Sequence, residues 1–195
     1  MIETSAIPPS TSTSNLKLTL RAWPVIALAT IGLCFLTQTV AKWFGVELPD
    51  QENIDIVRRC AGWNLTFALL VLQVIAIMPA LEECIFRWLF VMLPQRLLDK
   101  RRATRDANRP GTEDRATSHS AIRLFNYSTV LISSALFSAA HYLSQPWPDA
   151  AFLALFFFGL AQCWIYRTTE RLSCPILNHA LFNLTNLVLL FIVPE

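Results

Sequence analysis

The sequence has little charge for its length. Only 15% of its 195 residues are Asp, Glu, Lys or Arg, whereas roughly a quarter of the residues in an average soluble domain are charged. Hydrophobic residues make up 54% of the chain, and 13 Phe and 6 Trp exclude an intrinsically disordered protein. The 5 Gly are too few for a collagen-like repeat. This composition favours a protein whose surface faces lipid.

Two further features are missing. The 5 Cys are odd in number and irregularly spaced, which argues against a disulfide framework and against a paired CxxC zinc motif. The chain also has no internal repeat, although many transporters are built from two related halves. A transporter of that kind is therefore disfavoured.

The apolar residues are gathered into long stretches. A helix of about 20 residues crosses the roughly 30 Å hydrocarbon core of a bilayer. The sequence therefore predicts an all-α fold, a polytopic transmembrane helix bundle with about five spans (four to six). The apolar stretches cover residues 22–41, 61–94, 124–143, 150–166 and 172–193. The second exceeds one straight span, so it is either one long helix or two pieces divided near Pro79.

Polar segments divide the chain into three regions. Residues 1–21 are polar and are expected to form a disordered cytoplasmic tail, and residues 22–60 to form a membrane anchor and an outer loop. Residues 61–193 hold the remaining apolar stretches and form the core of the protein. A basic cytoplasmic loop at residues 95–123 is expected to interrupt this core.

Lys and Arg set the expected orientation in the membrane. The N-terminal tail, residues 95–123 and residues 167–171 together hold twelve of them, and the opposite connections hold three. Because cytoplasmic loops carry the excess of Lys and Arg, we expect the N-terminus in the cytoplasm and the C-terminus outside. The basic loop lacks interleaved aromatic residues, so we expect it to lie near the lipid surface and to bind no nucleic acid.

Three charged residues lie inside an apolar stretch. Each costs on the order of 2.5–3.5 kcal/mol at the centre of a membrane helix, so each needs a partner or a function. Glu83 and Arg87 are four residues apart with the acid first, the favourable order for an ion pair on one helix face. Glu82 points about 100° away from Glu83 and is left without a counter-ion. This pattern predicts a structural role for Glu83 and Arg87 and a chemical role for Glu82.

Two histidines also lie inside apolar stretches. Phe137 and His141 share one helix face, as do His179 and Asn183, because each pair is four residues apart. A single buried histidine is more often a hydrogen-bonded core residue than a catalyst. Two histidines, an asparagine and an unpaired carboxylate on three apolar segments instead indicate an intramembrane active site.

The order of these residues resembles a known family. Glu82–Arg87 reads EExxxR, Phe137–His141 reads FxxxH and His179–Asn183 reads HxxxN. Together they resemble the three motifs of the CPBP family, the intramembrane endopeptidases of the CAAX-prenyl-protease and bacteriocin-processing type. The resemblance covers about residues 61–193, which would then be a CPBP-like protease core.

The resemblance implies an enzyme that hydrolyses a peptide bond inside the membrane. Glu82 and His141 would activate water, and His179 and Asn183 would stabilise the oxyanion. The substrate would be a membrane-anchored, prenylated or leader-peptide protein. The small size resembles bacterial members, so the expected location is the bacterial inner (cytoplasmic) membrane.

Three other residues would support this site. Glu83 and Arg87 would hold the first helix in shape, with Phe137 beside them. No cofactor is favoured, although zinc is possible because Glu82, His141 and His179 form an acceptable zinc ligand set. No HExxH motif is present, which favours the metal-independent, glutamic-type mechanism.

Other functions are open at this point. Cys84 could be proposed as a nucleophile, but no neighbouring base supports it. Glu82 and the two histidines could instead form the proton relay of a proton-coupled carrier. A membrane scaffold without catalytic activity is a third alternative.

Overall fold

The computed structural model describes residues 12–48, 52–62, 64–108, 115–142 and 150–192, and helices make up nearly all of this part of the chain. No strand occurs within these ranges. The all-α prediction is therefore confirmed. The helices are α1 (Ser12–Trp43), α2 (Glu52–Cys60), α3 (Leu65–Leu72), η1 (Gln73–Ile77), α4 (Met78–Glu83), η2 (Cys84–Met92), α5 (Leu93–Asn108), α6 (Arg115–Tyr142), α7 (Ala151–Thr169) and α8 (Ser173–Ile192), with η marking π-helical segments.

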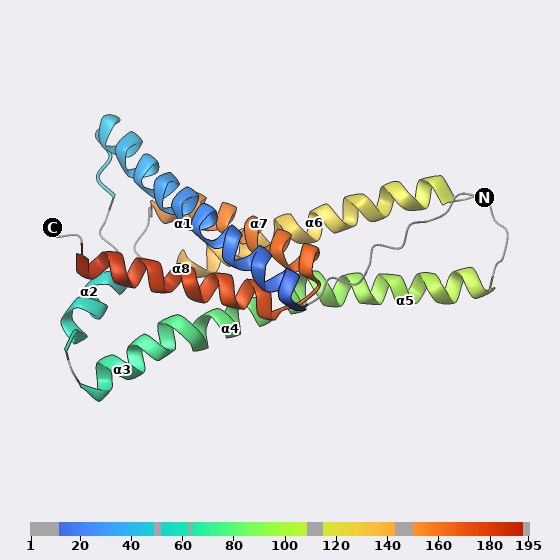
Figure 1. The fold of residues 1–195 in the computed structure, drawn as a ribbon. Coiled ribbons are helices and arrows are strands. Elements are labelled where there is room, and N and C mark those ends of the chain that lie inside the picture. The colour runs from blue at the N-terminus through green and yellow to red at the C-terminus, as the bar shows by residue number, and fades with distance from the viewer. Residues whose placement is uncertain (1–11, 49–51, 63, 109–114, 143–149, 193–195) are drawn as a thin grey trace.

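The long helices run back and forth along one direction (Figure 1). Helices α5 and α6 extend together from one end of the bundle, and α2 and the end of α8 lie at the other (Figure 1). Helix α7 contacts both α6 and α1, and α1 also packs against α8. Helices α5 and α6, which carry many of the Lys and Arg residues, therefore lie together at one end of the molecule.

Four helices are long and apolar enough to cross a membrane, counted over the described ranges: Thr13–Trp43, Leu65–Thr104, Ala151–Thr169 and Ser173–Ile192. This number lies within the predicted four to six. Helix α6 contains residues 124–142 of the expected span 124–143 but is not among the four; Ser133, Ser134 and Ser138 lower its hydropathy. Large apolar side chains on the spans are exposed, for example Leu28 (73%) and Phe35 (70%), as expected for contact with lipid.

The apolar stretch 61–94 contributes to one continuous helical path. Helical segments follow one another without a break from Leu65 through α5, and two of them, η1 and η2, are π-helical. Pro79 lies in the first turn of α4, directly after η1. Proline cannot donate a backbone hydrogen bond, and a π turn is one way in which a helix adapts to such an interruption. The proline therefore alters the helix without dividing it.

Two expectations about polar segments were wrong for the residues that the structure describes. Residues 12–21, expected to be disordered, form the first turns of α1, because Asn15 and Thr19 are buried and Asn15 donates a hydrogen bond to the Thr169 carbonyl. Residues 95–123, expected to be a loop, are helical in α5 and α6 on both sides of positions 109–114. Residues 1–11 lie outside the described part.

An aromatic core joins the helices that carry the candidate residues. Phe86, Phe137, Phe158 and Phe182 pack together with Ala27. The ring of Phe137 meets that of Phe86 edge to face at 5.4 Å and lies 5.9 Å from that of Phe158. This core fixes η2, α6, α7 and α8 relative to one another.

Candidate active site

The centre of the site is a buried carboxylate with two partners. Glu83 is fully buried; its Oε2 lies 2.9 Å from Nε of Arg87, and its Oε1 lies 3.0 Å from Nδ1 of His179. The ion pair expected between Glu83 and Arg87 is therefore present. The contact with His179 comes from tertiary packing, since the two residues are 96 positions apart.

Arg87 is fully buried beneath this carboxylate. Its guanidinium carbon lies 4.9 Å from the ring centre of Phe137, close enough for a cation–π contact. Its Nη1 and Nη2 have no hydrogen-bond acceptor among the described residues. The charge of Arg87 is thus balanced mainly by Glu83, and removing that carboxylate would leave a buried cation unpaired.

Glu82 faces the other side of the same histidine. Its Oε2 lies 3.5 Å from Nε2 of His179, and its side chain keeps 17% exposure while that of Glu83 has none. The same Oε2 atom has no hydrogen-bond partner within the described residues. Two adjacent carboxylates therefore have different surroundings: Glu83 is enclosed by its partners, whereas Glu82 is partly accessible.

His179 is held in one orientation. Its Nδ1 donates to Glu83, so Nε2 is the nitrogen directed at Glu82. The ring of Phe158 packs against the imidazole at 5.0 Å and that of Phe137 at 5.7 Å, both edge to face. Rings on two sides and a carboxylate on the third fix the position of Nε2.

His141 approaches the site from α6. Its Nδ1 lies 2.9 Å from the Phe137 carbonyl oxygen and donates to it, which leaves the lone pair on Nε2. The imidazole packs against the Phe137 ring at 4.8 Å, and the same ring touches His179. The Phe137 ring therefore contacts both histidines.

Asn183 lies one helical turn beyond His179 and is half-buried. Its Nδ2 donates to the carbonyl oxygen of Val74, in the π-helical segment η1, at 2.9 Å. This bond connects α8 to the helix that carries Glu82 and Glu83. The structure thus brings Glu82, Glu83, Arg87 and His179 together directly. Phe137 packs against His179, His141 packs against Phe137, and Asn183 lies one turn further along α8.

A second polar network behind His179 was not predicted from the sequence. Gln162 of α7 donates to Oδ1 of Asn178 at 2.9 Å, and Nδ2 of Asn178 lies 3.4 Å from the carbonyl oxygen of Thr19. All three residues are fully buried. The available signal was an uncharged polar residue inside an apolar stretch, and Asn178 directly precedes His179. This network fixes the first turns of α8 against α7 and α1.

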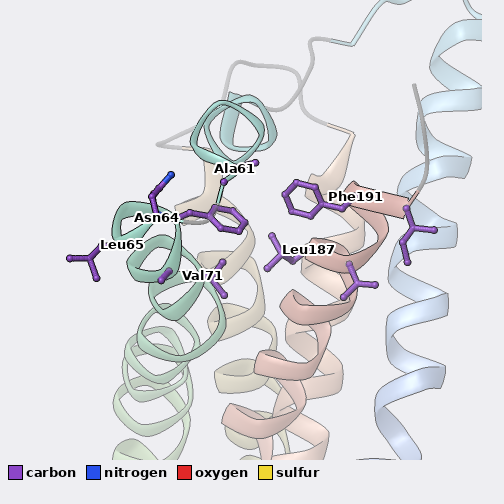
Figure 2. A pocket seen from close by; sticks show the side chains of 11 residues that line it. Ala61, Asn64, Leu65, Val71, Leu187 and Phe191 are labelled. Atoms are coloured by element: carbon purple, nitrogen blue, oxygen red, sulfur yellow. The ribbon is translucent and has the colours of Figure 1, made fainter.

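An open apolar groove lies between α3 and α8, about 960 Å³ in volume. Figure 2 shows Val71 on one wall and Leu187 and Phe191 on the other. The Phe191 ring meets that of Phe67 edge to face at 5.9 Å. Val71 and Leu187 are about one helical turn from Val74 and Asn183 respectively. One end of the groove therefore lies beside the candidate site.

The alternative zinc set does not fit this arrangement. No group of three His, Cys, Asp or Glu side chains converges as a metal site would require in the part of the chain that the structure describes. Glu82 and His179 are adjacent, and the third residue of the set, His141, packs against the Phe137 ring that also contacts His179.

One of three comparisons with known proteins gave a match. Neither the curated proteins nor the solved structures gave a match. The sequence profile of the Rce1-like type II CAAX prenyl endopeptidases matches residues 63–185, more than half of the chain and all three motifs. The protein is therefore a member of the Rce1-like family of CAAX-type intramembrane endopeptidases.

Proposed function

We propose that the protein cleaves a lipid-anchored protein or peptide near its C-terminus, by direct attack of water within the membrane. The observation that carries this proposal is the placement of His179 between two carboxylates, with Nδ1 on Glu83 and Nε2 facing Glu82. Only Glu82 is partly exposed, so it is the carboxylate that a water molecule and a substrate can reach.

In this mechanism Glu82 is the general base. It takes a proton from water while the water oxygen attacks the carbonyl carbon of the scissile peptide bond. His141, whose Nε2 carries the lone pair, is the second acceptor that orients the water. The C–N bond then breaks, and the departing nitrogen takes the proton from Glu82. The products are a carboxylic acid and an amine, and the enzyme is restored.

The developing oxyanion needs donors. We assign this role to His179, when its Nε2 is protonated, and to the second N–H of the Asn183 amide. Donors of this kind are worth roughly 3–4 kcal/mol each in other hydrolases.

The groove supports a substrate with an apolar anchor. A peptide that reaches the site from the cytoplasmic end would extend its lipid chain towards the opposite end, between α3 and α8. The groove is lined almost entirely by apolar side chains and begins about one turn from Asn183. We place the basic ends of α5 and α6, and with them the N-terminus, in the cytoplasm.

The test uses the purified full-length protein in liposomes. The probe is a synthetic peptide with a farnesylated cysteine and three further residues, and an otherwise identical peptide without the farnesyl group is the comparison. We expect one cut, on the C-terminal side of the modified cysteine, identified by the mass of the products. Glu47→Gln changes an exposed carboxylate and is the control. Failure of the wild-type protein to cleave farnesylated and geranylgeranylated peptides would contradict the proposal.

Cys84→Ala tests the rival nucleophile. Cys84 is exposed on η2 and is not part of the cluster around His179. We expect this variant to keep the wild-type rate. Loss of all activity in a correctly folded variant would favour a cysteine protease.

A further inference from the structure

Asn183 is bound to a carbonyl group that the helix itself leaves unpaired. In η1 the Met78 amide donates to the carbonyl of Gln73, five residues earlier. The next amide position is Pro79, which has no N–H. The Val74 carbonyl therefore accepts no hydrogen bond from the Met78 amide, which already donates to Gln73, or from Pro79, which has no N–H. Nδ2 of Asn183 donates to this carbonyl instead, at 2.9 Å.

This contact also decides the orientation of the Asn183 amide. A carbonyl oxygen accepts hydrogen bonds only, so the amide must direct its NH₂ group, and not its oxygen, at Val74. One N–H is used in this bond and the other is left for a ligand. If the Val74 carbonyl were already paired with a backbone N–H, the Asn183 amide could adopt either orientation. Since Asn183 and His179 lie on one face of α8, the same bond also holds the helix face that carries the histidine.

We infer that Pro79 is a positioning residue for the proposed hydrolysis. By removing one backbone donor and leaving the Val74 carbonyl free, it fixes the Asn183 amide with an N–H available to the oxyanion. The inference deepens the proposed function, because it concerns the donor assigned there, but the hydrogen bond itself can be tested without any substrate.

The first test is a double-mutant cycle on thermal unfolding in detergent. In the wild-type background, Asn183→Ala leaves the Val74 carbonyl unpaired, and we expect the Tm to fall by about 2–8 °C. In the Pro79→Ala background residue 79 regains an N–H that can donate to the helix, so Asn183→Ala should lower the Tm by less than half as much. Pro24→Ala, in the exposed part of α1, is the matched proline control and should show no such coupling.

The second test is the cleavage rate of the farnesylated peptide. Pro79→Ala should keep or raise the Tm, because Ala favours a helix. Its kcat should fall about 10–100-fold with KM unchanged, as expected when a catalytic group is displaced by about 1 Å. If Pro79 only stabilised the fold, its replacement would not lower kcat while keeping or raising the Tm.

Two results would overturn the inference. One is an equal loss of Tm on Asn183→Ala in the two backgrounds. The other is a wild-type kcat for Pro79→Ala. If the wild-type protein cleaves no prenylated peptide, the proposed function fails, and the thermal cycle alone then decides whether Pro79 frees the carbonyl that Asn183 binds.

Discussion

Glu83 accepts a hydrogen bond from Nδ1 of His179 at 3.0 Å, across 96 positions of sequence. The same carboxylate balances a fully buried arginine, whereas its neighbour Glu82 remains partly exposed. Two adjacent glutamates thus have separable roles: one supports the fold and orients the histidine, and the other is available to water.

Glu83→Gln should destabilise the protein strongly. The change leaves Arg87 buried without a counter-ion, and removing one partner of a buried ion pair costs about 3–5 kcal/mol. Thermal unfolding of the purified variant, compared with Glu47→Gln, measures the effect. A Tm for Glu83→Gln equal to that of the wild type would contradict a supporting role for this carboxylate.

Gly159→Ala should loosen the contact between α7 and α6. An added Cβ at this position would lie 3.1 Å from Cα and Cβ of Ser134, closer than such atoms normally approach. Small residues allow helices to pack closely in membranes, and overpacking costs about 1–3 kcal/mol. Gly32→Ala is the control, because nothing lies within 4 Å of its added Cβ. Equal Tm values for the two variants would show that the close approach does not matter.

Leu187→Trp should impair binding of lipidated substrates. The larger side chain fills part of the groove between α3 and α8, where we place the apolar anchor. We expect KM for the farnesylated peptide to rise about tenfold, since burial of one large apolar group is worth about 1.5–3 kcal/mol. The kcat should stay within about twofold. Leu189→Trp, on the same helix but outside the groove lining, should leave both constants unchanged. An unchanged KM for Leu187→Trp would place the anchor elsewhere.

Metal removal should not affect the enzyme. Because no three suitable side chains converge among the described residues, we expect chelation with phenanthroline to leave the cleavage rate within about twofold. Metal analysis of the untreated protein provides the second measurement. Stoichiometric zinc that is lost together with activity would contradict the glutamic-type mechanism.

Much of the site could be predicted because its elements are local. The spacing of four residues between Glu83 and Arg87 predicts a shared helix face, and the ion pair is present even though the segment from Cys84 onwards is π-helical. The length of the apolar stretches likewise predicts the helical fold. Such inferences need only the rise and the period of a helix.

The contacts between helices could not be predicted in this way. The pairing of Glu83 with His179, and of Asn183 with the Val74 carbonyl, depends on how α8 packs against the long helix. The polar start of α1 has the composition of a disordered tail. Asn15 in this segment is nevertheless buried and donates a hydrogen bond to the Thr169 carbonyl. The charged segment is helical at residues 95–108 and 115–123 because Leu, Arg, Lys and Ala favour helices without an apolar stripe.

The most direct measurement compares Glu82→Gln with the wild type, using kcat on the farnesylated peptide and Tm in the same detergent. Glu82 is partly exposed and has no buried counter-ion of its own, so we expect a Tm within about 2 °C of the wild type. We expect kcat to fall at least about 10²–10⁴-fold, as for loss of a general base. A Glu82→Gln variant that retains kcat within about tenfold of the wild type would contradict the central claim that Glu82 activates the water.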